Sequence, residues 1–210
     1  MKNLIIVGAG GFGRSIYNLA TECLGFNTDF QIKGFLDDDL AVLDSFANYP
    51  PILATINEYI IQQDDVFTCS IGSVPTKKKV IQQLISRGAR FITLIHNTAN
   101  VAKNAQIGTG SIIAINSILD SDSIVKDFVL IQSGSVIGHD ASVGNFSRID
   151  CNVVCVGGVI IEDEVTLHTS AIINHKVVVG KQAVVGAGSF VIRRVKENTV
   201  VHGNPATRLK

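Results

Sequence analysis

The stretch that decides the fold reads Ile131-Gln-Ser-Gly-Ser-Val, Ile137-Gly-His-Asp-Ala-Ser, Val143-Gly-Asn-Phe-Ser-Arg and Ile149-Asp-Cys-Asn-Val-Val. Each six-residue unit opens with Ile or Val and carries Ser, Ala or Val at its fifth position. The unit repeats without a break from Val101 to Lys196, and Cys155 is the one opening residue that is not Val, Ile or Leu. Such a fixed period predicts a repeat architecture more firmly than local propensities do.

A bulky residue and a slim one recurring every six residues predict short parallel strands joined by tight corners, with both positions facing inward. Three units make one triangular coil, so the sixteen units predict about five coils, spaced about 4.8 Å apart. Residues separated by one coil then stack in columns along the resulting parallel β-helix. Positions within one column can therefore act together.

The sequence before this repeat predicts a different kind of unit. An apolar strand ends at Val7, a glycine-rich turn follows, and Arg14–Cys23 has a helical pattern. Further predicted elements are strands Phe30–Leu36, Val66–Ile71 and Phe91–Leu94 and a helix Thr76–Ser86. Alternating strands and helices favour an α/β fold with a parallel sheet. About 95 residues are too few for a complete doubly wound domain, so we expect half a Rossmann-like unit at 1–96, followed by the β-helix at 97–210.

The amino-acid composition argues against nucleic acid and membranes as binding partners. The 210 residues hold 18 basic and 18 acidic side chains, so no net charge attracts nucleic acid or an anionic membrane. The four cysteines form no CxxC pair and no apolar run approaches the roughly 18 residues of a membrane span. We therefore expect a cytoplasmic protein with reduced thiols, no signal peptide and no membrane span.

The glycine-rich turn predicts an anion site. Gly8, Gly10 and Gly13 allow a phosphate close to the backbone, and the following helix directs free N–H groups at the same place. Asp37, directly after the second predicted strand, suits hydrogen bonds from a ribose hydroxyl or a base N–H. Ser73 and Lys77 open a later helix, where the lysine is a candidate phosphate ligand.

The glycine-rich unit, the strand end Ile71-Gly72, the hexads and the closing Gly203-Asn204-Pro205-Ala206 together resemble the NeuD-like sugar O-acyltransferase family, which includes the PglD-like nucleotide-sugar N-acetyltransferases. The resemblance covers nearly the whole chain. It implies a left-handed winding of the β-helix, a homotrimer and acetyl-CoA as cosubstrate, without a metal. It also implies a nucleotide-linked amino sugar as acceptor, such as a UDP-4-amino-deoxysugar for surface glycan biosynthesis. Other members of the family O-acetylate sialic acids, and that alternative stays open.

The resemblance also implies residue roles. The loop glycines, including Gly11, and Asp37 would bind the nucleotide. The family's catalytic histidine precedes an acidic residue in a hexad, which matches His139 and Asp140 here. A neutral imidazole can accept a proton from the attacking group, and a carboxylate can fix its tautomer.

One coil after the candidate base, the backbone N–H of Gly157 would bind the thioester carbonyl and the oxyanion formed from it. Arg148 occupies the place of a second family histidine and could hold that carbonyl oxygen or a phosphate; a surface arginine without a role is an equal alternative. His175 and Arg193 continue the His139 column towards CoA, and Arg194 adds charge suited to its phosphates.

The remaining candidates are structural. His168 stacks over Asp150 as a surface pair, His96 and His202 are expected to be structural, and Cys155 is a core thiol. Two other functions share this scaffold. A carbonic-anhydrase-like zinc lyase would need His139, His168 and His175 together, and a nonenzymatic nucleotide-sugar sensor would use its β-helix only to form trimers.

Overall fold

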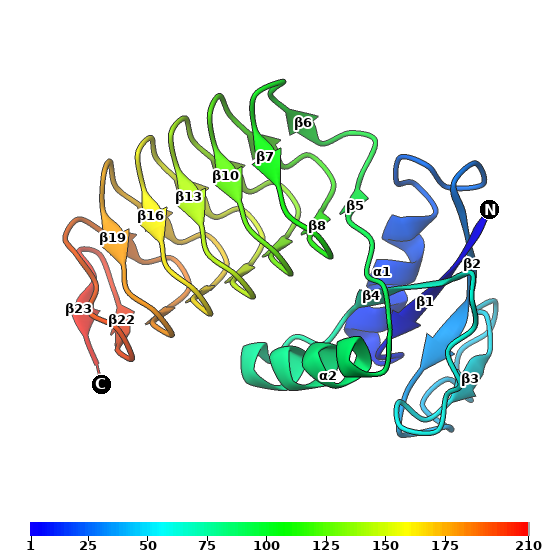
Figure 1. Ribbon diagram of the computed structural model, residues 1–210. Coiled ribbons are helices and arrows are strands. Elements are labelled where there is room, and N and C mark those ends of the chain that lie inside the picture. The colour runs from blue at the N-terminus through cyan, green and yellow to red at the C-terminus, as the bar shows by residue number, and fades with distance from the viewer. Residues whose placement is uncertain (210) are drawn as a thin grey trace. The chain divides into compact units, whose positions relative to one another are not determined.

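In the computed structural model, which describes residues 1–209, the chain forms two compact units, Met1–Leu94 and a second that begins at Ile95. The first unit holds a four-stranded parallel sheet in the order β3-β2-β1-β4 (Figure 1). The elements are β1 (Lys2–Val7), α1 (Gly11–Ala20), β2 (Phe30–Leu36), β3 (Ile52–Ala54), β4 (Asp65–Cys69) and α2 (Val74–Ser86).

Two strands differ from the sequence prediction, and the helix predicted at Arg14–Cys23 lies three residues earlier, at Gly11–Ala20. The short edge strand β3 was not predicted. The predicted strand Phe91–Leu94 is reduced to one bridge between Phe91 and Phe67, and Leu94 begins β5 (Leu94–Ile95) of the following unit. The central strand β1 lies between β2 and β4, which is the arrangement that opens a crevice at the carboxyl end of a parallel sheet.

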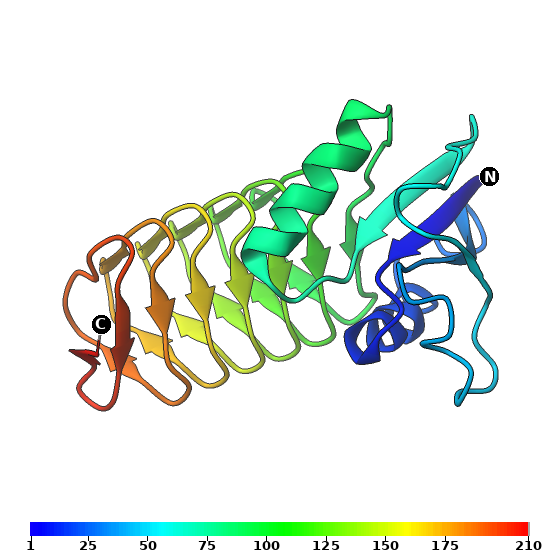
Figure 2. The same cartoon turned by 90° about the horizontal axis from the view of Figure 1, so that it is seen from below.

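The second unit is a parallel β-helix of very short strands arranged in three sheets (Figure 2). Each sheet is named after one of its strands. The β12 sheet contains β6 (Asn100–Val101), β9 (Ile118–Leu119), β12 (Val136–Ile137), β15 (Val154–Cys155), β18 (Ile172–Ile173) and β21 (Phe190–Val191). The β13 sheet contains β7 (Gln106–Ile107), β10 (Ile124–Val125), β13 (Ser142–Val143), β16 (Ile160–Ile161) and β19 (Val178–Val179).

The β14 sheet contains β5, β8 (Ile112–Ile113), β11 (Leu130–Ile131), β14 (Arg148–Ile149), β17 (Thr166–Leu167), β20 (Val184–Val185), β22 (Val200–His202) and β23 (Thr207–Arg208). Strands of successive coils pair in parallel, as Val136 does with Val154, eighteen residues later. The antiparallel pair β22–β23 ends the solenoid. The predicted period of one coil therefore holds along the unit.

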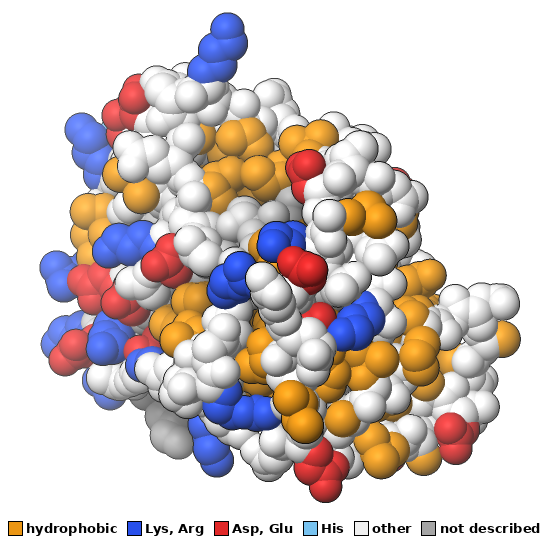
Figure 3. All heavy atoms as spheres, turned by 45° about the vertical axis from the view of Figure 1, so that its right-hand side comes forward, with side chains coloured by type: hydrophobic (Ala, Val, Ile, Leu, Met, Phe, Trp, Pro, Cys, Tyr) orange, Lys and Arg blue, Asp and Glu red, His pale blue; other side chains and the backbone are white. Residues whose placement is uncertain are grey.

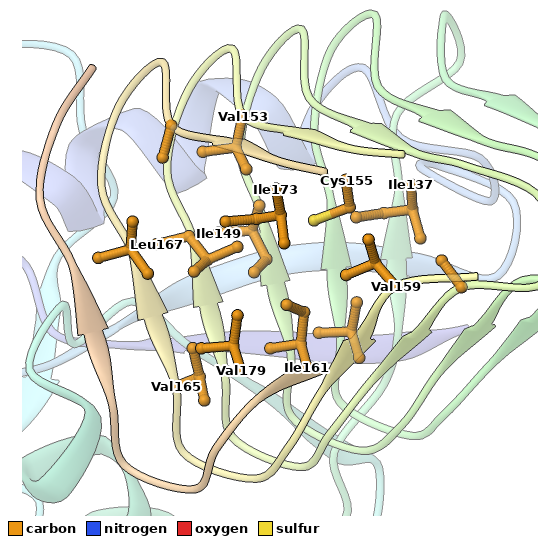
Figure 4. Packing of buried hydrophobic residues seen from close by; sticks show 14 of the residues in the cluster. Ile137, Ile149, Val153, Cys155, Val159, Ile161, Val165, Leu167, Ile173 and Val179 are labelled. Carbon is orange, nitrogen blue, oxygen red and sulfur yellow. The ribbon is translucent and has the colours of Figure 1, made fainter. Parts of the chain in front are cut away.

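The core of the β-helix consists of the opening and fifth residues of the hexads (Figure 4). Ile149, Leu167 and Val185 are fully buried in one column. Serines at fifth positions also connect coils, as Ser135 does: its Oγ donates to the carbonyl of Asp150 (2.7 Å) and accepts from the N–H of Val153 (3.2 Å). A slim polar residue thus fits inside the corner and satisfies backbone groups of the next coil.

The corners share one backbone conformation, although different residue types occupy them. The fourth residue of each hexad from residue 110 to residue 188 is left-handed, with φ between 55° and 71°. Gly134 and Gly158 adopt it without strain, and Asn or Asp tolerates it well. Phe128 and Phe146 also adopt it, with their rings stacked 5.1 Å apart. This repeated bend gives the corner side chains the same direction in every coil.

Candidate active site

The corner between β12 and β13 carries a histidine–aspartate pair. Nδ1 of His139 lies 2.7 Å from Oδ2 of Asp140, and both side chains are mostly exposed. The left-handed backbone of Asp140 (φ 58°) accompanies this contact between adjacent residues. The hydrogen bond raises the pKa of His139, desolvation opposes that increase, and the charges of Asp140 and Asp120 add to it. With Nδ1 occupied, Nε2 is the nitrogen available to a ligand.

The imidazole of His139 lies directly against Gly157 on the next coil. A Cβ added at Gly157 would lie 2.3 Å from Nε2 and 2.5 Å from Cε1 of the ring. The N–H of Gly158 donates to the carbonyl of His139 (2.8 Å), which holds the two corners in register. Among residues 1–209, no group accepts a hydrogen bond from the N–H of Gly157. The structure thus brings an imidazole and a free backbone donor together.

The same column continues towards the C-terminal end of the solenoid. His175 follows Gly157 by one coil, and the N–H of Lys176 donates to the Gly157 carbonyl (3.2 Å). Arg193 and Arg194 are exposed and line a cavity of about 300 Å³ together with other basic side chains. Arg193 therefore continues the His139 corner along one edge, whereas Nη2 of Arg194 lies 3.8 Å from Oε1 of Glu162.

Arg148 lies on the β14 sheet, away from the His139 corner within a single chain. Its Nε donates to Oδ1 of the buried Asp150 (2.6 Å), which also accepts from Gln132 Nε2 (2.7 Å). Oδ2 of Asp150 lies 2.9 Å from Nδ1 of His168. His168 does pair with Asp150, but the pair belongs to a four-residue cluster whose carboxylate is buried. Within one chain the structure does not unite Arg148 with His139.

The glycine-rich turn joins the end of β1 to α1. Gly8 has φ 99°, and a Cβ at Gly13 would lie 2.1 Å from the carbonyl oxygen of Gly8, so strand and helix meet backbone to backbone. Gly10 is the N-cap of α1 and supplies no side-chain cap. Within residues 1–209, the N–H groups of residues 10–13 have no hydrogen-bond acceptor. Free N–H groups at a helix N-terminus suit an anion.

The other predicted nucleotide ligands are placed differently. Asp37 Oδ2 accepts from the N–H of Ala9 (2.7 Å) and Oδ1 from that of Asp39 (3.0 Å), so this carboxylate fixes the glycine-rich turn. Ser73 caps α2 through Thr76. Lys77, predicted as a phosphate ligand, is buried with 5% exposure. Burial raises the pKa of the Cys69 thiol to about 11, and the charge of Lys77 opposes that increase.

Sequence reasoning missed one residue of this turn. Arg14 follows the last glycine of the motif, and its guanidinium stacks on the ring of Phe46, 3.5 Å from the ring centroid. The signal in the sequence that could have identified Arg14 is its position, as a basic residue directly after the last glycine of the motif.

No helix within residues 1–209 is both long and apolar enough to cross a membrane.

The described residues contain no group of three or more His, Cys, Asp or Glu side chains placed to hold a metal. His139 and His175 share one corner, whereas His168 lies in the cluster around Asp150. Basic and acidic side chains are intermixed on the face shown in Figure 3.

Comparisons with known proteins bear on both units. Residues 3–84 match the family described as PglD N-terminal domain. A segment of 116 residues is 33% identical to UDP-N-acetylbacillosamine N-acetyltransferase of Bacillus subtilis (strain 168), covering 54% of this chain and 51% of that protein. The matched segment thus spans about half the length of this curated relative.

Solved structures match over the whole chain. The acetyltransferase domain of PglB from Neisseria gonorrhoeae FA1090 has a TM-score of 0.90 with 26% identity, covering 100% of both chains. PerB from Caulobacter crescentus, solved with CoA and GDP-perosamine, has a TM-score of 0.88 with 22% identity over 100% of this chain and 98% of that chain. The predicted fold, a Rossmann-like unit followed by a left-handed β-helix, is confirmed, and so is the predicted resemblance.

Proposed function

We propose that the protein is an acetyl-CoA-dependent N-acetyltransferase that acylates the amino group of a nucleotide-linked amino sugar, in glycan biosynthesis. The observation that carries the proposal is the imidazole of His139, held by Asp140 and lying against Gly157, whose N–H is free. Two relatives support the choice of substrates. The Bacillus subtilis relative is named UDP-N-acetylbacillosamine N-acetyltransferase, and the gonococcal PglB domain has been solved with acetyl coenzyme A.

The chemistry follows from these three residues. The amino nitrogen of the sugar attacks the thioester carbonyl carbon while Nε2 of His139 accepts a proton from that nitrogen. The N–H of Gly157 stabilises the negative charge that develops on the carbonyl oxygen. As the C–S bond breaks, the proton passes to the CoA thiolate, and the products are the amide and CoA. Asp140 holds the Nδ1 proton and stabilises the charged imidazolium in between.

The two substrates would use different parts of the chain. The free N–H groups of residues 10–13, within the turn formed by Gly8, Gly10, Gly11 and Gly13, suit the diphosphate, and Asp37 keeps that turn in place. CoA would follow the column of His175 towards Arg193 and Arg194, whose charges suit its phosphates.

A homotrimer would complete the site. The outer face of the β12 sheet carries an apolar column: Ile118, Val136, Val154, Ile172 and Phe190. A continuous apolar stripe on a rigid face favours burial against other copies. One corner beside this sheet carries His139 and the other carries Asp150, so threefold packing on this sheet would bring Arg148 of one copy towards His139 of the next.

The cellular site that we propose is the cytoplasm. All four cysteines are free, and burial raises the pKa of the Cys155 thiol to about 12, which leaves it protonated and unreactive.

The test is release of free thiol from acetyl-CoA across UDP- and GDP-linked 4-amino sugars, with sialic acid as an O-acetylation arm. We expect turnover with at least one nucleotide-linked amino sugar. Turnover only with sialic acid would favour the O-acetyltransferase, and thiol release that is unchanged in His139→Ala would overturn the mechanism.

A further inference from the structure

Arg14 is an unpaired cation at the positive end of a helix. It lies in the first turns of α1, and its contact with Phe46 is cation–π; its guanidinium N–H groups have no acceptor among residues 1–209. The first turn of α1 holds no acidic residue. Because a helix N-terminus carries partial positive charge, a cation placed there is unfavourable unless an anion joins it.

The guanidinium and the free backbone donors converge. Nη2 of Arg14 would lie 3.8 Å from a Cβ built on Gly11, the first residue of α1, so the side chain turns back towards the glycine-rich turn. The N–H groups of residues 10–13 point out of the same helix end without acceptors. Five guanidinium N–H donors and several backbone donors around one place suit an anion with more than one oxygen.

The loop between β2 and β3, residues 37–51, holds the arginine in this position. Phe46 supplies the ring beneath the guanidinium, and Tyr49 contacts Tyr17 of α1 edge to face, with centroids 5.4 Å apart. Stacking on a ring face leaves the N–H edge of a guanidinium free for oxygen atoms. The loop therefore orients Arg14 without consuming its donors.

We propose that Arg14 is the residue that binds the diphosphate of the nucleotide-linked substrate, with Phe46 positioning its guanidinium. Lys77, the cation that the sequence favoured, is buried with 5% exposure. This inference rests on the proposed function for its ligand, and its test does not require acetyl transfer.

The experiment compares calorimetric binding of UDP, GDP and dTDP with that of the matching nucleosides, on the full chain. Arg14→Ala should weaken binding of the preferred diphosphate by about ten- to a hundredfold, because it removes charge-assisted hydrogen bonds. Binding of the nucleoside should stay the same. Arg14→Lys should retain part of the affinity, and Phe46→Ala should weaken diphosphate binding less than Arg14→Ala does. Lys79→Ala, which removes an exposed lysine of α2, is the matched control and should bind as the unaltered protein does.

In turnover, Arg14→Ala should raise KM for the nucleotide sugar while kcat and KM for acetyl-CoA stay constant. Equal loss of nucleoside and diphosphate binding, unchanged diphosphate binding, or the absence of any diphosphate binding by the unaltered protein would each overturn the inference. Selective loss in Arg14→Ala in a protein that transfers no acetyl group would support it and refute only the transferase. If Arg14→Ala melts early, the comparison of Arg14→Lys with Phe46→Ala decides.

Discussion

Replacing Gly157 with alanine should displace the imidazole of His139, the proposed base, while changing little else. The added Cβ would lie 2.3 Å from Nε2, 2.5 Å from Cε1 and 2.9 Å from Cδ2 of His139, whereas ordinary contacts begin at 3.4 Å. The ring must therefore move by at least about 1 Å. Gly157 does not have a positive φ, so alanine fits its backbone, and the exposed ring can swing outward without disturbing the core.

A displacement of this size at a reacting group costs roughly a hundredfold in rate. We therefore expect kcat/KM of Gly157→Ala, followed by thiol release, to fall by about that factor, with little change in thermal stability. The chain offers a matched control: a Cβ at Gly186 would lie 2.5 Å from Cδ2 of His202. Gly186→Ala should displace that histidine and keep full activity.

The effect should also disappear when the imidazole is absent. In a His139→Ala background, Gly157→Ala should cost no further activity, because both changes remove the same interaction. Full activity of Gly157→Ala, or equal losses in Gly157→Ala and Gly186→Ala, would refute the inference that the absent side chain of Gly157 leaves space for the imidazole of His139.

Further expectations concern the base, its partner, the core and the assembly. His139→Ala should lower turnover at least about a hundredfold in the thiol-release assay, while calorimetry shows unchanged CoA affinity. Asp140→Asn should move the acid limb of the kcat/KM profile to lower pH, because the carboxylate raises the pKa of His139 and activity requires the neutral ring; a limb at the original pH would exclude that role. Ile149→Ala, in the fully buried column, should lower the free energy of unfolding in urea by about 2–5 kcal/mol, and the partly exposed Ile124→Ala far less. Val154→Asp, on the outer face of the β12 sheet, should convert a trimer into monomers in sedimentation; an unaltered protein that sediments as a monomer would contradict the proposed trimer.

The architecture of the second unit could be predicted because its apolar residues recur with a fixed period of six. Any six residues of the solenoid are ambiguous, but a Val, Ile or Leu recurring at the same phase fixes which side chains face inward and which corners stack. That phase alone placed His139 and Gly157 in one column. The edge strand β3 of the first unit has no such repetition. It is three residues long and follows two prolines, so no local pattern predicts it.

The finer features of the site depend on conformation and packing. Side chains of adjacent residues ordinarily diverge, and the contact between His139 and Asp140 accompanies a left-handed bend at the aspartate. Asn, Asp and Gly at many fourth hexad positions hinted at this bend, but Phe128 and Phe146 at equivalent positions concealed it. Nothing in Lys77-Lys78-Lys79 shows which lysine is buried, because tertiary packing around α2 decides that.

The eighteen-residue spacing between paired strands also sets how this chain can change in length. Inserting one residue in a strand would turn every later side chain of that coil to the wrong side, whereas removing one whole turn rejoins equivalent points. Excision of 159–176 would connect Gly158 to Val177, retain His139 over Gly157 and discard His175. Evolution, or an engineer, can therefore shorten or extend the C-terminal end in steps of one turn, which changes the length of the proposed CoA-binding edge without changing the corner that holds His139 and Gly157.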